Sequence, residues 1–409
     1  MRLPYHFFIA RRYFRSKKKH RGISINTLIS TAGVALGVMT LIIVLSVMSG
    51  FHEDLQDKIL GVNAHVVAMN YKGKMRDYET IKEKIDSLKG VTDSAPFIYG
   101  QVMLRYGDRA QGVVIRGIDP VSGTGTIDIL QKLEAGSIDH LKDGNEAPGI
   151  IIGKELLSKL GLFVGDTVDM VSPIGEIGPL GMMPKMKKFR IAGYFEAGMY
   201  EYDSSLAFIG LTQAQKFFKY GNAVTGIEIK LNDIYNADRI SDNIQKMLGP
   251  PFYAKDWMQM NRNLFSALKL EKIVMFIILT LIVLVASFNI ISNLIMIVIE
   301  KGREIAILKA MGAKNKGVML IFMLHGLIIG VTGTVIGLAG GSVLCYLLKT
   351  YKFITLPGDV YYLSYLPVKM SLFDFVVVPA AAIIITLLAT AYPSWQAAKI
   401  DPVEPLRYE

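Results

Sequence analysis

Apolar residues along the chain are gathered into four long runs, and between them apolar and polar positions alternate over short distances. A helix needs about 20 apolar residues to cross a bilayer core of roughly 30 Å, and each run is long enough for that. The first run is too long for the apolar part of a signal peptide, so we expect a retained anchor. With their flanks, the four predicted membrane-spanning helices are residues 22–50, 266–299, 318–348 and 372–393.

Residues 51–265 have the mixed pattern of a folded domain that is large enough for its own core. Two β-rich runs enclose Gly107-Asp108, which predicts a hairpin. Amphipathic patterns stopped by glycine predict helices over 78–90 and 237–249. Further strands are predicted over 166–172, 187–195 and 224–232. The predicted fold is an α-helical membrane protein with four transmembrane helices plus a large α+β domain, of two subdomains, inserted between helices 1 and 2.

Helical spacing extends the first run beyond its end and the second run before its start. Both extensions are in residues 51–265. The second run is preceded by Trp257, Met260 or Asn261, Leu264 and Leu268 on one helix face, with no helix breaker between them. The stretch "FHEDLQDKI" extends the first run in the same way. We therefore expect two rigid stalks that link movement of the domain to movement of the membrane helices, which a flexible linker could not do.

Positive charge is concentrated beside the apolar runs. Residues 1–21 read as an interfacial helix and contain eight Lys and Arg without an acid, and residues 300–317 and 394–409 add more cations. With four spans these segments share one side of the membrane, which the positive-inside rule makes cytoplasmic. Residues 51–265 and 349–371 are then outside the cytoplasm. The net charge of +10 thus indicates topology rather than nucleic-acid binding, because basic stretches beside a span contact lipid headgroups.

Motifs of catalysis and metal binding do not occur in the sequence. It has no G-x-x-x-x-G-K-[ST] loop, no G-x-S-x-G motif, and no two of its six histidines at the spacing of a zinc site. The single cysteine, Cys345, falls in the third run, so the external domain has no disulfide. We therefore expect no enzyme activity and no metal on this chain. His325, also in the third run, is either a proton-relay residue or a neutral, hydrogen-bonded histidine.

Glycine recurs every four residues in the third run, at Gly333, Gly337 and Gly341. Small residues on one face let another helix approach closely. That helix belongs either to the same bundle, which we favour, or to a dimer partner.

A short charged and helix-prone segment, residues 300–317, separates the second and third runs. It is predicted to form a helix ended by Gly312 and bordered by Lys309 and Lys314. Helical spacing places four residues along one side: Glu304, Ile307, Leu308 and Met311. An apolar stripe with charged borders is suited to docking a soluble partner. A helix lying flat on lipid headgroups would show nearly the same pattern.

Residues 172–189 are rich in proline and glycine, which we expect to exclude both helix and regular strand. The segment is either an ordinary long hairpin loop or a binding surface, because long loops are usually functional or disordered and methionine suits adaptable contacts. It carries three methionines beside three lysines: Met182, Met183 and Met186, with Lys185, Lys187 and Lys188.

Three stretches resemble signature sequences of a known family: "STAGVALGVMTLIIVLSVMSGFHEDLQ", "EKGREIAILKAMGAKNKGVMLIFMLHG" and "YPSWQAAKIDPVEPLRYE". They are similar to the lipoprotein-releasing ABC transporter permeases of the Lol system of Gram-negative bacteria, related to the macrolide-exporter-type, mechanotransmission permeases. The resemblance covers essentially the whole chain. It implies an inner-membrane subunit with both termini cytoplasmic and a periplasmic domain. It also implies that ATP and Mg²⁺ bind to a separate ATPase dimer, so that this chain carries no cofactor.

The same resemblance assigns residues to partners. The coupling helix that fits a groove on the ATPase would comprise Glu304, Ile305, Ile307, Leu308, Lys309, Met311 and Gly312. A hook that captures a soluble periplasmic lipoprotein carrier would comprise Pro173, Pro179, Leu180, Gly181, Met182, Met183, Pro184 and Lys185. Acyl chains of the lipoprotein would lie between the first and second spans, against Val44, Val47, Met48, Phe265 and Leu268. ATP-driven closure of the ATPases is then implied to move the spans and stalks, and to expel a lipoprotein from the outer leaflet to the carrier.

Two other functions fit the superfamily. A cell-division-type regulator of a periplasmic cell-wall hydrolase usually has a much smaller external domain, and an efflux permease normally carries its ATPase on the same chain. A membrane-tethered receptor without transport is disfavoured by the coupling-helix motif. The second permease subunit is either a homologue or a second copy, and the sequence leaves open whether this chain binds the carrier, the lipoprotein or both.

Overall fold

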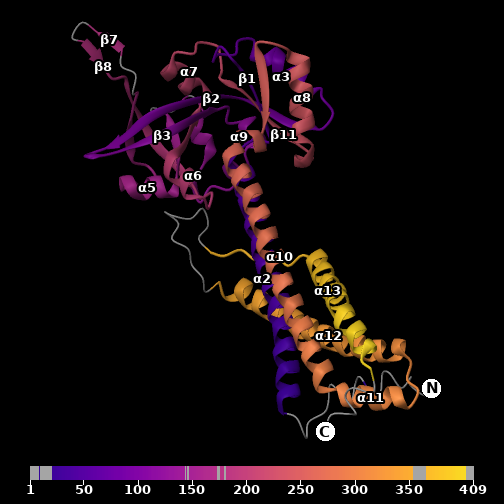
Figure 1. The fold of residues 1–409 in the computed structure, drawn as a ribbon. Helices are drawn as coiled ribbons and strands as arrows, with labels where there is room; N and C mark the ends of the chain where they lie inside the picture. Colours follow the sequence, from indigo (N-terminus) through magenta and orange to yellow (C-terminus); the bar gives the residue numbers. More distant parts are fainter. Residues whose placement is uncertain are drawn as a thin grey trace. The chain divides into compact units, whose positions relative to one another are not determined.

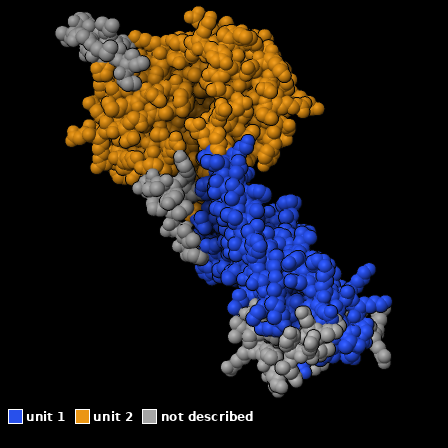
Figure 2. Space-filling model, in the orientation of Figure 1, with its two compact units in different colours: residues 1–52, 267–354, 366–409 blue, residues 53–266, 355–365 orange. Residues whose placement is uncertain are grey.

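The structure is a computed structural model of the chain. It describes residues 9, 21–142, 144, 147–172, 176–178, 181–352 and 365–401, with the backbone alone at 21–26, 176–178, 181–183 and 279. The chain divides into two compact units, coloured differently in Figure 2. Residues 1–52, 267–354 and 366–409 form the helical unit, and residues 53–266 and 355–365 form the sheet unit.

Four helices of the described residues are long and apolar enough to cross a membrane, as the sequence predicts. They are α2 (Arg21–Val62), α10 (Arg262–Glu300), α12 (Asn315–Tyr351) and α13 (Leu372–Lys399). A shorter helix, α11 (Gly302–Ala310), lies between α10 and α12 in the chain (Figure 1).

Glycines let α12 pack closely against two helices of its own unit. A Cβ atom added at Gly333 would lie 2.8 Å from the Val34 Cβ, and one added at Gly337 would lie 2.5 Å from a backbone oxygen of α2. Towards α13, a Cβ atom at Gly330 would lie 2.6 Å from the Thr386 Cγ2. The glycine repeat of the third run therefore serves packing within the bundle, which is the interpretation favoured from the sequence.

The two predicted stalks differ in continuity. α2 runs without interruption to Val62, as expected. The other stalk is broken once, because α9 (Trp257–Met260) ends at Asn261 and α10 begins at Arg262. The Asn261 Nδ2 donates to the Trp257 carbonyl oxygen at 2.9 Å. This side chain therefore competes with the backbone N–H of Asn261 for the same helical acceptor. The expectation of an unbroken helix from Trp257 onward was therefore wrong at this one residue.

The sheet unit is built on a mixed sheet, ten-stranded in the described residues. Its order is β12-β1-β11-β2-β3-β10-β5-β9-β4, and β6 pairs with both β2 and β9. β10 is parallel to β3 and β5 is parallel to β9, whereas the other pairs are antiparallel. The strands are β1 (Val66–Asn70), β2 (Val91–Tyr106), β3 (Arg109–Ile118), β4 (Ala135–Gly136), β5 (Gly149–Gly153), β6 (Thr167–Val171), β9 (Met186–Phe195), β10 (Leu206–Gly210), β11 (Gly226–Leu231) and β12 (Phe252–Asp256).

The local elements predicted from the sequence are present. The hairpin around Gly107-Asp108 is β2–β3, with Tyr106 opposite Arg109, and the three further predicted strands are β6, β9 and β11. The two predicted amphipathic helices are α3 and α8. The α-helices of this unit before α9 are α3 (Tyr78–Asp86), α4 (Gly123–Thr126), α5 (Lys154–Leu160), α6 (Tyr200–Ser205), α7 (Leu211–Phe218) and α8 (Ala237–Leu248).

The last residues of α2 are buried within the sheet unit. Val62 belongs to the apolar core around Phe195 and Phe208, whose rings meet edge to face at 5.4 Å. Arg116 of β3 donates from Nη1 to the Val62 carbonyl oxygen at 2.7 Å and from Nε to Glu228 Oε1 of β11 at 2.7 Å. Both charged residues are buried, and burial raises the pKa of Glu228 while the guanidinium lowers it. The last carbonyls of a helix lack partners inside it, so Arg116 fixes the end of α2 to two strands.

Arg116→Met is expected to destabilise the sheet unit by about 3–5 kcal/mol, because the buried Glu228 carboxylate loses its partner. Adding Glu228→Leu should recover most of that loss, because no buried charge then remains. The matched control is Lys154→Met, which removes an exposed ion pair with Glu196 and should change stability by less than about 1 kcal/mol. Denaturant unfolding of the purified full chain in detergent, read by amide hydrogen exchange in β3 and β11, measures each variant. A loss as small as the control's would contradict the anchoring role.

Candidate functional site

The inner face of α11 is fixed to the helical unit. Ile305 is fully buried, and Lys309 Nζ donates to the carbonyl oxygens of Ala398 and Ile400, at 2.8 and 2.7 Å, where α13 ends. A cation at a helix C-terminus is favoured by the helix dipole. The apolar neighbours of Ile305 in this cluster are Ile297, Val298, Val318, Phe322 and Ala397. Ile305 and Lys309 thus attach α11 to the bundle, and their assignment to ATPase coupling stays a prediction.

The outer face of α11 carries the predicted apolar stripe. Ile307 is 45% and Met311 80% exposed, Leu308 is half-buried, and Glu304 is exposed. The Glu304 carboxylate is paired with Lys301 in the first helical turn, where the helix dipole favours negative charge. The stripe therefore lies where the helical spacing predicts it, on a helix whose opposite face is held in place.

Gly312 ends this helix with a left-handed backbone turn, at φ +95°. The Gly312 amide donates to the Lys309 carbonyl oxygen at 2.9 Å, and the Ala313 amide donates to the Leu308 carbonyl oxygen at 3.0 Å. These two bonds form a Schellman motif, in which a residue with a Cβ atom would be strained. The predicted stop at Gly312 is confirmed.

An apolar cavity of about 380 Å³ lies between α2, α10 and α13 of the helical unit. Val34 and Leu41 of α2, Phe276 and Val283 of α10, and Val378 of α13 are among its lining residues. Its volume is in the range of small-molecule sites. Its lining offers hydrocarbon and few polar groups, so its chemistry suits an apolar chain.

The residues predicted to contact acyl chains are not among those that line this cavity. Val44, Val47, Met48 and Leu268 are half-buried residues of the helical unit. Phe265 belongs to the sheet unit, where its ring meets Trp257 edge to face at 5.0 Å. Their role stays a prediction. Sequence reasoning missed the cavity because its lining residues do not differ in type from residues that face lipid.

The segment predicted to be a hook contains a small antiparallel ribbon of its own (Figure 1). β7 (Glu176–Gly178) pairs with β8 (Gly181–Met183), from Glu176 opposite Met183 to Gly178 opposite Gly181. The expectation that proline and glycine exclude regular strand was therefore wrong. Pro184 lies outside the paired residues, where it interrupts no ladder bond. Pro173, Pro179 and Leu180 lie outside the described residues, and Gly181, Met182 and Met183 are described by their backbone.

Lysines hold the base of this hook to α7. The Ser172 amide donates to the Lys185 carbonyl oxygen at 2.8 Å, which closes the base. Lys185 Nζ donates to the Phe217 carbonyl oxygen at 2.8 Å and lies 5.3 Å from that residue's ring centroid, in the last turn of α7. Lys187 Nζ donates to Gln213 Oε1 at 2.6 Å, whereas Pro184 and Lys188 are exposed. Lys185 and Lys187 thus both have contacts with α7.

An apolar row lies beside the base of the hook. Met103 of β2 is opposite Val171 of β6, which is opposite Met186 of β9. Residues directly opposite each other in neighbouring strands share one face of a sheet. Met103 and Met186 are 41% and 46% exposed, so this row offers apolar contact next to the hook. Met186 was named from the sequence but Met103 was missed, although an exposed methionine in an alternating strand is a usable signal.

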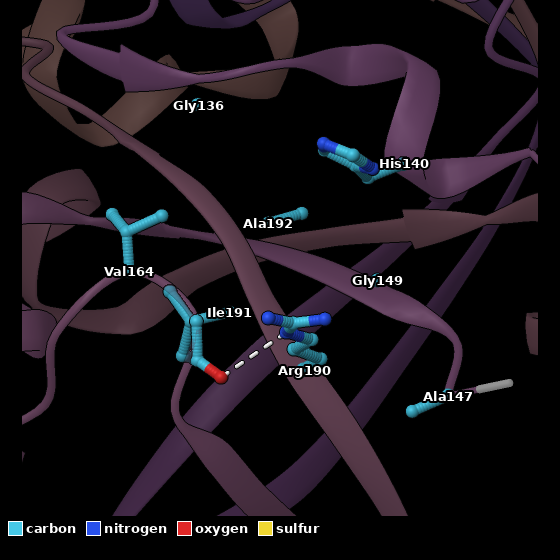
Figure 3. Close-up of a pocket in the computed structure, with 9 residues that line it drawn as sticks. Gly136, His140, Ala147, Gly149, Val164, Arg190, Ile191 and Ala192 are labelled. Carbon is cyan, nitrogen blue, oxygen red and sulfur yellow. Dashed lines mark hydrogen bonds between the residues drawn. The ribbon is translucent and has the colours of Figure 1, made fainter. Parts of the chain in front are cut away.

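A second, more polar cavity of about 420 Å³ lies in the sheet unit (Figure 3). Its lining combines glycine backbone with the nitrogen-bearing side chains of His140 and Arg190. The Arg190 Nε donates to the Gly165 carbonyl oxygen at 3.2 Å, the bond drawn in Figure 3. The described lining residues include no carboxylate or nucleophilic side chain, so they do not form an acid–base or nucleophile pair. No group of three or more metal-ligating side chains is found in the described parts of the chain.

Both units match known families. Residues 27–247 match the MacB-like periplasmic core domain, and residues 276–402 match the FtsX-like permease C-terminal model. The lipoprotein-releasing system transmembrane protein LolC of Xylella fastidiosa is 38% identical over 414 residues, which cover 99% of each chain. The chain belongs to the lipoprotein-releasing (Lol) permease family. The family resemblance found in the sequence motifs is thereby confirmed.

Relatives within the Lol permease family carry two subunit names. The LolE protein of Haemophilus influenzae is 29% identical over 98% of each chain, and the LolC protein of the same organism is 28% identical over the full length of each. The chain is thus about equally similar to both Haemophilus subunits. Its four candidate membrane helices and its periplasmic-type domain with a mixed sheet are those of an ABC transporter permease.

Proposed function

We propose that this permease subunit extracts lipoproteins from the outer leaflet of the inner membrane and passes them to a soluble periplasmic carrier. ATP hydrolysis on a separate cytoplasmic ABC ATPase dimer drives the transfer, and ATP and Mg²⁺ bind to that dimer. The observation that carries the proposal is the full-length similarity to lipoprotein-releasing relatives, at 38% identity. The chain acts with a second permease subunit, either a homologue or a second copy.

Coupling to the ATPase is proposed for the outer face of α11. Ile307 and Met311 offer apolar surface, and Leu308 lies between them on the same side. Force applied to this face passes into the bundle through Ile305 in its apolar cluster and through Lys309 on the end of α13. A helix that only lies on lipid headgroups would not require these contacts of Ile305 and Lys309 with the bundle.

Carrier binding is proposed for the hook and the apolar row at its base. A hairpin that is paired before binding loses less conformational entropy on association than a free loop. Met182 and Met183 of β8, together with Met103 and Met186 of the apolar row, would supply adaptable apolar contact. The lipoprotein's acyl chains are proposed to enter the apolar cavity between α2, α10 and α13, in addition to the surface around Val47.

The proposed topology places Asn315 in the cytoplasm and Asp108 in the periplasm, because cations gather in residues 1–21, 300–317 and 394–409. In a Cys345→Ala background, Asn315→Cys should resist a membrane-impermeant thiol reagent in intact cells and react after permeabilisation. Asp108→Cys should react in both conditions and serves as the matched control. Labelling at position 315 in intact cells would reverse the proposed orientation.

Purification of the tagged chain from native membranes tests the assembly. We expect an ABC ATPase and a second permease chain to co-purify, and an added lipoprotein carrier to be retained. Retention of a cell-wall hydrolase in place of the carrier would favour the regulator, and a periplasmic efflux adaptor would favour the efflux permease.

A further inference from the structure

The polar cavity of the sheet unit lies at an interruption in the strand pairing of β9. On one edge of β9, β6 pairs up to Arg190 and β4 pairs from Gly193, so Ile191 and Ala192 face no described strand there. On the other edge the register with β5 shifts, which makes Ala192 an extra residue of β9, a β-bulge. Ile191 and Ala192 both line the cavity of about 420 Å³ that Figure 3 shows.

Backbone hydrogen bonds fix the walls of this cavity to β9. The Gly165 amide donates to the Ile191 carbonyl oxygen at 2.9 Å, and the Ile191 amide donates to the Asp166 carbonyl oxygen at 2.8 Å, which holds the segment before β6. The Ser137 amide donates to the Ala192 carbonyl oxygen at 3.2 Å, which holds the segment after β4. The cavity is therefore formed before any ligand binds, which lowers the entropy lost on binding.

The Arg190 side chain is fixed at this cavity with most of its donors unused. A guanidinium has five N–H donors, and the Arg190 Nε donates to the Gly165 carbonyl oxygen at 3.2 Å. Arg190 has no ion pair and no other side-chain hydrogen bond with a described residue. The bond from Nε thus orients the side chain and leaves both Nη groups for a ligand. Their fork geometry matches two oxygens of one anion.

The rest of the lining is compatible with a negative charge. His140, in the 3₁₀ helix η2 (Ile138–Leu141), brings a second nitrogen-bearing side chain to the cavity that Arg190 lines (Figure 3). The described lining residues include no carboxylate. The nearby Asp166 carboxylate accepts from the Phe163 amide at 2.8 Å. An anion at Arg190 therefore meets nitrogen donors from two elements and no repelling charge in the lining.

Shape and size narrow the class of anion. A tetrahedral phosphate presents oxygens in more directions than a planar carboxylate, so it can accept from two separate elements. The cavity volume is within the range of sites for small organic molecules and exceeds what a single phosphate fills. The apolar side chains of Ala147, Val164 and Ile191 offer a surface for a carbon-containing body.

We propose that this cavity binds a phosphate group carried on a small organic body, with glycerol phosphate as the simplest example. The phosphate accepts from the Arg190 Nη groups and from His140, and the body contacts Val164 and Ala147. This site goes beyond the proposed lipoprotein release, because it uses neither the hook, nor α11, nor the membrane helices. A soluble phosphate ester and the headgroup of a phospholipid share this chemistry.

Amide hydrogen exchange in the purified complex tests the site. An ATPase in the complex would bind phosphate groups as well, so the readout must be local. Added glycerol phosphate should slow exchange in residues 135–141 and 163–166 in a saturable way. Arg190→Met should weaken this effect at least about tenfold, because charge-assisted hydrogen bonds are lost. No slowing at millimolar ligand in the unsubstituted complex would overturn the proposal.

The matched control is Lys132→Met, which removes an exposed cation of the same unit from outside the cavity lining. It should leave the apparent affinity for glycerol phosphate unchanged. An equal loss in the Lys132 and Arg190 variants would show attraction by net charge alone and would overturn the site.

Chemical modification gives a second measurement that needs no substitution, in case Arg190→Met fails to fold. Phenylglyoxal reacts with exposed guanidinium groups, and peptide mass spectrometry measures the reaction at each arginine. Glycerol phosphate should protect Arg190 and leave Arg239, an exposed arginine of α8, unprotected. Equal protection of both arginines, or of neither, would contradict a site at Arg190.

A comparison of ligands by the same exchange measurement identifies the source of the phosphate. Inorganic phosphate that binds as tightly as glycerol phosphate would reject the organic body, and succinate that binds more tightly would reject the phosphate. Short-chain phosphatidylglycerol that binds more tightly than glycerol phosphate assigns the site to a lipid headgroup. Weaker binding of that lipid assigns it to a soluble ester, and both results support the site. These measurements contain no ATP, lipoprotein or carrier, so their failure would leave the proposed function untouched.

Discussion

Replacing residues 174–183 with a Gly-Ser linker of equal length is expected to abolish carrier binding, with affinity reduced about 100-fold or more. The linker removes the β7–β8 pairing and both methionines of β8, so the apolar contact and its preorganisation are lost together. Folding, membrane insertion and basal ATPase activity should stay nearly intact, because the base is closed by the Ser172–Lys185 bond outside the replaced residues. Binding kinetics between the purified complex and its carrier measure the effect.

Two controls separate the hook from its surroundings. The same linker inserted between Gly107 and Asp108, in the exposed β2–β3 turn, should leave carrier affinity unchanged. Lys188→Glu should slow association at low salt more than it speeds dissociation, because Lys188 is exposed whereas Lys185 and Lys187 contact α7. Unchanged affinity in the linker variant would reject the hook and favour the regulator function.

Ile307→Asp combined with Met311→Asp is expected to weaken association with the ATPase about 100-fold. Both side chains lie on the outer face of α11, and each change would bury a charge without a partner in the proposed groove. The inner contacts of Ile305 and Lys309 are untouched, so α11 should remain attached to the bundle. Co-purification of the ATPase with the tagged chain measures the loss.

The matched control for α11 is Lys316→Ala, an exposed change at the start of α12 and off the stripe. It should leave ATPase association unchanged. A helix that lies flat on lipid headgroups predicts the opposite pattern, with the double aspartate variant retaining the ATPase. Full association and transport in that variant would show that the outer face of α11 is not the docking surface.

Most of the features that were predicted correctly depend on short stretches of the sequence. The spacing of Ile307 and Met311 gave the exposed stripe, and Gly312 marked its end. Gly107-Asp108 gave the hairpin, because a turn signal between β-rich runs depends on neighbouring residues alone. These features are decided over a few residues, and a single sequence contains them.

Features that depend on distant partners could not be predicted. The parallel pairs of β3 with β10 and β5 with β9 join segments whose own patterns do not name a partner. Arg116 reads as an ordinary charged residue of an alternating strand, and only the fold brings it to Glu228 and the end of α2. Likewise, the contact of Lys185 with α7 is set by the packing of the sheet unit, and the residues around Lys185 in the sequence do not indicate this partner.

Lipoprotein release from proteoliposomes tests the central claim most directly. The vesicles contain the permease complex and a radiolabelled triacylated lipoprotein, and soluble carrier is added outside. We predict that lipoprotein appears on the carrier only when ATP and the ATPase are present, and that the 174–183 linker variant hydrolyses ATP without transferring lipoprotein. ATP hydrolysis by the intact complex with no lipoprotein on the carrier would contradict the account.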